Sequence, residues 1–229
     1  MTNFLHSDLR TTHTSQTRRR TLLAQLAAVA LVAQLAACGR KPPRAQALPA
    51  GATVLALGDS LTSGVGASAD TAYPAALQRL TGWKVINGGV SGDTSAQALD
   101  RLPSLLRQHQ PALVIVSIGG NDFLRRLSSA TTRTNVQRIC ADARASGAQV
   151  LLVAVPELSL MATVGKLSDH ALYEEVAEEL KIPLHSKGWS GVLAQDRLRS
   201  DQIHANAAGY EQFAQGLVET LKTTGLLVQ

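Results

Sequence analysis

The stretch ALVIVSIGG, residues 112–120, is a continuous apolar run that ends in two glycines. A run without polar alternation is typical of a strand that is covered on both faces of a sheet. Comparable runs are AQVLLVAVP at 148–156 and TVLALG at 53–58, and weaker ones are KVING at 84–88 and IPL at 182–184. The sequence therefore predicts a five-stranded sheet with buried central strands.

Helical segments separate these strands. The first opens with cap residues and contains Pro103, which we expect to kink or split it. The alternation predicts one three-layer α/β/α domain at residues 52–229, with a mainly parallel sheet between helices. The predicted helical segments are 93–109, 133–147, 168–181 and 206–223.

The N-terminal part has the pattern of a targeting segment. Arg18, Arg19 and Arg20 precede an apolar stretch at residues 21–37, which is short for a membrane span. The stretch ends in LAAC, residues 35–38, which resembles the bacterial lipobox. That resemblance implies removal of the signal peptide 1–37 and acylation of Cys38, whereas an uncleaved signal anchor is the alternative.

The residues after Cys38 complete this prediction. Gly39 stands where inner-membrane lipoproteins usually carry Asp, which favours an outer-membrane protein that faces the periplasm. Residues 38–51, rich in Pro, Ala and basic side chains, are expected to form a flexible tether. We therefore predict a domain that is held in the cell envelope by a lipid anchor.

Composition excludes some function classes. The 229-residue chain is 45% hydrophobic and has a formal net charge of +5, but removal of residues 1–37 leaves 18 basic and 16 acidic residues. No basic block with interleaved aromatics argues for nucleic acid. No Cys/His cluster has zinc spacing, and Cys140 is interpreted as a small buried hydrophobe in a helix.

Three distinctive loops follow the first three predicted strands. They are GDSLTSG, NGGVSGDTS and GGND. Ligand sites in parallel α/β sheets form where loops leave the carboxyl ends of the strands. Taken alone, Ser60 of the first loop more often caps a helix than attacks a substrate, and Thr62 breaks the G-x-S-x-G pattern.

A serine nucleophile needs a base. Four histidines follow Cys38, at positions 109, 170, 185 and 204. His204 differs from the others because Asp201 precedes it by three residues, a separation that can bring both side chains to one side of a turn. A carboxylate there could fix the imidazole tautomer and stabilise its charged form. A polar loop that caps the last helix is the alternative.

An acyl-transfer site also needs donors for the developing oxyanion. The Gly92 loop offers backbone N–H groups beside a helix start, and Asn121 offers a side-chain amide. Each of these features also occurs in ordinary turns. Their order along the chain, from GDSL through Gly92 and GGND to Asp201-x-x-His204, closely resembles the SGNH hydrolase family, or GDSL esterases and lipases, over roughly residues 53–224.

The resemblance implies the flavodoxin-like fold of that family and a role for each matching residue. Ser60 would be the nucleophile, His204 the base and Asp201 its orienting acid. The N–H groups of Ser60 and Gly92 and the amide of Asn121 would form the oxyanion hole. No metal or cofactor would be required, and the substrate would be a small acyl ester or a lipid.

The substrate itself stays open at this stage. The segment after residue 156 does not align with the acyl-pocket loop of the family, and it could line an acyl groove or belong to the core. Alternatives to a lipid esterase or thioesterase are an O-acetylesterase of envelope glycans and an inactive envelope-binding lipoprotein. The oligomeric state is not predicted. The apolar candidates for an acyl groove are Leu158, Leu160, Met161 and Val164.

Overall fold

Five parallel strands form the central sheet of the computed structural model, which describes residues 45–157 and 167–228. The strand order is β2-β1-β3-β4-β5, and every pair is parallel, which confirms the predicted sheet. The carboxyl ends of the strands therefore lie at one edge. The strands are β1 (Thr53–Gly58), β2 (Lys84–Gly89), β3 (Leu113–Ser117), β4 (Gln149–Val153) and β5 (Leu184–His185).

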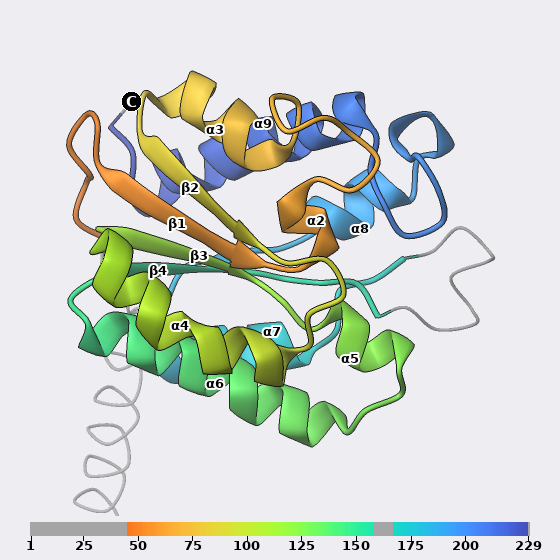
Figure 1. The fold of residues 1–229 in the computed structure, drawn as a ribbon, viewed down its shortest axis with the longest axis horizontal. Coiled ribbons are helices and arrows are strands. Elements are labelled where there is room, and N and C mark those ends of the chain that lie inside the picture. The colour runs from red at the N-terminus through yellow and green to blue at the C-terminus, as the bar shows by residue number, and fades with distance from the viewer. Residues whose placement is uncertain (1–44, 158–166, 229) are drawn as a thin grey trace, which may run out of the picture. The chain divides into compact units, whose positions relative to one another are not determined.

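Helices cover both faces of the sheet (Figure 1). Helices α3, α8 and α9 pack on one face, and α4, α6 and α7 pack on the other. The longer helices are α3 (Tyr73–Thr81), α4 (Ser95–His109), α6 (Ser129–Ala145), α7 (Leu172–Leu180) and α9 (Ala207–Thr224). Short elements complete the fold: α2 (Ser60–Ser63), α5 (Gly120–Leu124), α8 (Gly188–Leu193) and the 3₁₀ helix η2 (Asp196–Leu198).

The strands build two hydrophobic cores because successive side chains point to opposite faces. On β3, Leu113 and Ile115 pack in the core beneath α9, while Val114 and Val116 pack in the core beneath α6. All four side chains are fully buried. This burial on both faces explains the continuous apolar run in the sequence. Both cores lie within the compact unit Pro42–Gln229, so this part of the chain contains what it needs to fold alone.

The structure differs from the sequence-based expectation in two places. Helix α4 runs unbroken from Ser95 to His109 with Pro103 inside it, so of the two expected effects, a kink or a split, the split does not occur. The predicted tether ends earlier than residue 51, because Leu48 is 6% exposed and its N–H donates to the carbonyl of Leu226. Burial of this apolar side chain attaches the described residues 45–51 to the domain.

Cys140 is buried in α6, as interpreted from the sequence, and burial raises the pKa of its thiol to about 12. It therefore stays protonated and packs as a small apolar side chain. Cys38 lies outside the described residues. Within the two described ranges, we find no helix with the length and hydropathy needed to span a membrane.

Candidate active site

Ser60 begins the single helical turn α2, directly after β1. Asp59 caps this turn, since its Oδ1 atom accepts a hydrogen bond from the N–H of Leu61 at 3.1 Å. The turn lies close over β2, where a Cβ on Gly89 would overlap the backbone of Ser63. The glycine at the end of β2 thus lets the serine turn pack against the sheet edge.

His204 approaches Ser60 from a loop 144 residues further along the chain. The Nε2 atom of His204 lies 3.0 Å from Oγ of Ser60, and its Nδ1 atom lies 2.7 Å from Oδ2 of Asp201. The structure thus brings together the three side chains that the sequence indicates as nucleophile, base and orienting acid. The spacing matches that of a nucleophile hydrogen-bonded to a base, which is itself held by a third group.

Local hydrogen bonds fix the loop that carries Asp201 and His204. Its two ends pair in an antiparallel bridge between Arg199 and Ala205. The Oδ1 atom of Asp201 accepts from the N–H groups of Ile203 and His204, both at 2.8 Å. The three-residue spacing therefore forms a turn that orients the carboxylate toward the imidazole.

Asp201 is ionised at neutral pH. Desolvation raises the pKa of this carboxyl, but hydrogen bonds from His204 and Ile203 lower it more, so that the net pKa lies below its usual value of 3.8. The side chain is 52% exposed, and water screens part of this effect. An ionised carboxylate at Nδ1 stabilises the imidazolium form of His204.

Gly92 lies in the loop after β2, and Asn121 lies on the short helix α5. The amide Nδ2 of Asn121 donates to the carbonyl oxygen of Asp93 at 3.0 Å, which joins α5 directly to that loop. Gly92 has φ +85°, a conformation that favours glycine. Asn121 also lines a cleft with Ser60. Asn121 thus lies beside the predicted nucleophile and contacts Asp93, the residue that follows Gly92.

Two arginines brace these loops, and sequence patterns did not indicate them. Arg101 on α4 donates to Oδ2 of Asp93 at 2.7 Å and to the carbonyl oxygens of Gly88 and Gly58 at 2.7 and 2.9 Å. Arg125 donates from Nη2 to the carbonyl oxygen of Gly92 at 2.9 Å. A planar guanidinium with several donors suits such bracing.

Asp122 provides a third brace from the buried side. Its two oxygens accept from the N–H of Ser95 at 2.8 Å, from the Ser95 hydroxyl at 2.6 Å and from the Thr132 hydroxyl at 3.2 Å. This carboxylate is 2% exposed. Asp122 thus links α5, which carries Asn121, to the start of α4. It positions the amide of Asn121 and does not face the cleft.

Asp59 is a further buried acid of the site. It is 4% exposed, and its Oδ2 atom lies 3.5 Å from Nδ2 of Asn121. Burial raises the pKa of this carboxyl to about 6, although hydrogen bonding by Leu61 and the charge of His204 lower it. The aspartate of the GDS motif is therefore a buried carboxyl that contacts Asn121, the predicted oxyanion donor.

An apolar cleft opens beside Ser60 and Asn121. Its walls come from α2, α5, α8, the end of β4 and the loop of His204. The aliphatic and proline side chains that line it are Leu61, Leu124, Val155, Pro156, Leu193 and Ile203. Sequence patterns did not indicate these residues, because they come from five separate segments. The groove candidates Leu158, Leu160, Met161 and Val164 lie outside the described residues.

A larger cavity of about 430 Å³ lies between α8 and α9, and none of the predicted site residues lines it. In the part of the chain that the structure describes, no group of three or more His, Cys, Asp or Glu side chains could hold a metal ion. The chemistry indicated by the sequence thus gathers at the small cleft beside Ser60.

The sequence matches the model of the GDSL-like Lipase/Acylhydrolase family over residues 56–212. The chain belongs to this GDSL family. The match spans β1 to α9 and includes every residue brought together above. With the α/β fold and the relatives described next, membership shows that the chain is an ester-bond hydrolase.

Named relatives of this GDSL hydrolase are esterases. It is 39% identical over 160 residues to thioesterase 1/protease 1/lysophospholipase L1 of Escherichia coli, covering 67% of this chain and 76% of that protein. It is 34% identical over 181 residues to the esterase TesA of Pseudomonas aeruginosa, covering 74% of this chain and 88% of that protein. A crystal structure of TesA superposes with a TM-score of 0.67 at 31% identity, covering 75% of this chain and 99% of that structure.

Proposed function

We propose that the protein is a serine esterase that cleaves carboxylic ester or thioester bonds of acyl lipids, with Ser60 as its nucleophile. The observation that carries this proposal is the chain of contacts from Ser60 Oγ to His204 Nε2 at 3.0 Å and from His204 Nδ1 to Asp201 Oδ2 at 2.7 Å. An ionised carboxylate at Nδ1 keeps a proton there, which leaves Nε2 free to accept the serine proton.

The first half of the reaction forms an acyl-serine. Ser60 Oγ attacks the acyl carbonyl carbon while His204 Nε2 takes the hydroxyl proton, and Asp201 stabilises the resulting imidazolium. The carbonyl oxygen becomes an oxyanion that accepts hydrogen bonds from the N–H groups of Ser60 and Gly92 and from the Asn121 amide. The imidazolium then protonates the leaving alcohol or thiol as its bond to carbon breaks.

The second half releases the acid. Water enters, His204 Nε2 takes one of its protons, and the hydroxide attacks the acyl carbon through the same oxyanion. Collapse of this intermediate breaks the bond to Ser60 Oγ, which regains its proton from His204. Ser60 is then ready for the next substrate, and no step needs a metal or cofactor.

The lining of the cleft supports an acyl chain as the group bound beside Ser60. Leu61, Leu193 and Val155 surround the nucleophile with aliphatic carbon. An acyl chain loses water on entering such a cleft, whereas the hydroxyls of a sugar would lose hydrogen bonds there. The apolar lining therefore favours lipid esters over O-acetylated glycans, while the volume of the described cleft, about 20 Å³, admits only a small part of an acyl chain.

Hydrolysis of p-nitrophenyl butyrate by residues 42–229 tests the proposal. We expect Ser60→Ala to lose activity by a factor on the order of 10⁶ in kcat, since nucleophile removal disables the whole constellation. Ser63→Ala is the matched control, because Ser63 lies on the same turn and only donates to the carbonyl oxygen of Ser60. Equal rates for the wild-type and Ser60→Ala proteins would exclude Ser60 as the nucleophile.

Lipid attachment is a separate part of the proposal, and it rests on the sequence of residues 18–38. We propose that acylated Cys38 anchors the enzyme to the outer membrane, with the domain facing the periplasm. Full-length wild-type protein should partition into detergent, and Cys38→Ser should release it. A Cys38→Ser protein that stays with the membrane fraction would indicate an uncleaved anchor instead.

A further inference from the structure

Exposed apolar side chains lie on the loop after β2 and on and just after α5, the helix that forms one wall of the cleft. Five large hydrophobic side chains of the described residues are exposed, and three of them lie in these two segments: Val90 at 45%, Leu124 at 44% and Leu127 at 48%. Leu124 also lines the cleft with Ser60. Single exposed hydrophobics are ordinary on a protein surface, but their concentration beside an active site marks a surface that contacts something apolar.

Hydrogen bonds join the two segments that carry these side chains. Arg125 donates to the carbonyl oxygen of Gly92, which joins α5 to the loop that begins with Val90. The N–H of Leu127 donates to the carbonyl of Asp122 at 2.8 Å, so the chain folds back tightly after α5. Figure 1 shows α5 and this loop side by side at the carboxyl edge of the sheet. We call Val90, Leu124, Arg125, Arg126 and Leu127 the cleft rim.

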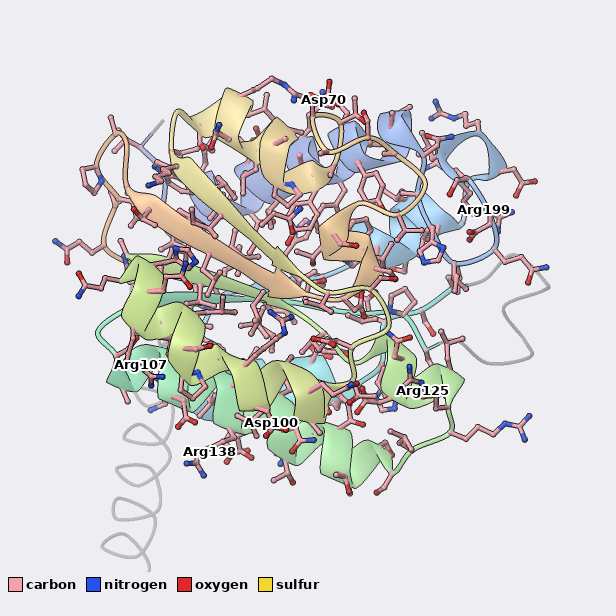
Figure 2. All side chains as sticks on the ribbon, viewed as in Figure 1. Asp70, Asp100, Arg107, Arg125, Arg138 and Arg199 are labelled. Carbon is pink, nitrogen blue, oxygen red and sulfur yellow. The ribbon has the colours of Figure 1, made fainter. Side chains whose placement is uncertain are left out.

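The cleft rim is also cationic. Arg125 and Arg126 are exposed, and neither forms an ion pair with a described carboxylate. Figure 2 shows Arg125 on α5, at the other end of the domain from Arg107. The carboxylates nearest to the rim in the chain, Asp59, Asp93 and Asp122, are at most 6% exposed, whereas Asp201 on the loop of His204 is 52% exposed.

We propose that the cleft rim docks on the surface of an anionic phospholipid bilayer. Aliphatic side chains next to arginines match the boundary between acyl chains and phosphate groups, where leucines enter the hydrocarbon and guanidiniums meet phosphate. A rim of this kind around an apolar cleft would let a lipid ester leave the bilayer without crossing water. The inference rests on the proposed function, since it supplies the route by which a lipid ester reaches Ser60.

Sedimentation with vesicles tests the docking. The Ser60→Ala form of residues 42–229 binds without consuming lipid and lacks the predicted anchor. We expect vesicles of phosphatidylcholine with about 30% phosphatidylglycerol to bind it at least ~5-fold more tightly than phosphatidylcholine alone, and 0.5 M NaCl to remove most of that difference. Arg126→Asp should abolish the preference for anionic vesicles, and Leu127→Ser should weaken binding to both kinds about 5-fold.

Matched substitutions far from the rim are the controls. Leu80 on α3 is 43% exposed, and Arg107 on α4 is exposed and forms no ion pair with a described residue. Leu80→Ser and Arg107→Asp should bind vesicles as the parent does. Aspartate suits position 126, because Arg126 has φ +55° and short polar residues tolerate that region.

The outcomes separate this inference from the proposed function. Vesicle binding that is absent, or equally weakened by the rim and control substitutions, would overturn the docking. A rim that instead forms a dimer, seen by analytical ultracentrifugation and lost in Leu127→Ser, would overturn it too. Rim variants that retain Ser60 should hydrolyse p-nitrophenyl butyrate as the wild type does, which shows that they fold. Hydrolysis that does not depend on Ser60 would overturn the proposed function and leave the vesicle result standing.

Discussion

Arg101 donates from Nε to Oδ2 of Asp93 across 2.7 Å, and the same guanidinium also holds the carbonyl oxygens of Gly58 and Gly88. One side chain thus joins the end of β1, the end of β2 and the loop that carries Gly92. The carbonyl of Asp93 in turn accepts from Asn121. Arg101 therefore positions both predicted oxyanion loops relative to Ser60.

Replacing Arg101 by Lys should lower kcat by about 10–100-fold and change KM little, because small displacements of catalytic groups carry penalties of this size. Lysine keeps the positive charge but lacks the planar fork that reaches three acceptors. The measurement is p-nitrophenyl butyrate kinetics, with Arg107→Lys on the same helix as the control. A kcat for Arg101→Lys within twofold of the wild type would contradict the positioning role.

Replacing Asp122 by Asn should destabilise the domain by about 1–3 kcal/mol, since one buried donor then loses its acceptor. The carboxylate accepts from both the N–H and the hydroxyl of Ser95 and from Thr132, and an amide offers only one oxygen. Urea denaturation measures the loss. Asp100→Asn on the exposed side of α4 is the control, and an equal effect of the two substitutions would refute the assignment.

Local sequence patterns predicted the fold well, but they did not predict the contacts by which Arg101, Arg125 and Asp122 hold the site together. Apolar runs marked the strands, because burial on both faces leaves a direct trace in composition. The turn that joins Asp201 to His204 was readable, since both residues lie within one local segment. The contact of Ser60 with His204 depends on the arrangement of the whole sheet, so only the resemblance to a known family indicated it.

Other features leave no such trace in the sequence. Arg101 and Arg125 bind backbone carbonyls, and no residue pattern marks a carbonyl as an acceptor. The cleft lining comes from separate segments that only the tertiary fold assembles. Pro103 was expected to kink or split the helix, and the helix is not split, because the packing of its other turns outweighs the hydrogen bond that the proline removes.

Replacing Asp201 by Asn should lower kcat by a factor on the order of 10³–10⁴, because the amide neither fixes the required tautomer nor stabilises the imidazolium. Hydrogen bonds hold the pKa of Asp201 below 3.8, so the wild-type enzyme should lose no activity through protonation of this acid until the pH falls below that value. Rates at fixed pH for the wild type, Asp201→Asn and the exposed control Asp100→Asn measure the effect. A loss under tenfold in Asp201→Asn would contradict the role.

Asp59 and His185 should give opposite pH dependences of stability. Burial raises the pKa of Asp59 to about 6 from 3.8, so the folded state binds its proton more tightly and the free energy of unfolding falls as the pH rises from 4 to 6. Burial lowers the pKa of His185 to about 4 from 6.5, so this residue makes the same free energy rise between pH 4 and 6.5. Each shift corresponds to about 3 kcal/mol, and the two largely cancel in the wild type.

Single substitutions should therefore reveal each slope. Asp59→Asn keeps an acceptor for the N–H of Leu61 and removes the carboxyl whose ionisation lowers the free energy of unfolding. Relative to the wild type, the free energy of unfolding of this variant should therefore rise by about 3 kcal/mol as the pH increases from 4 to 6. His185→Gln should show the reverse trend. Urea denaturation at pH 4, 5 and 6 measures both. A constant difference between Asp59→Asn and the wild type over this range would mean that folding does not raise the pKa of Asp59.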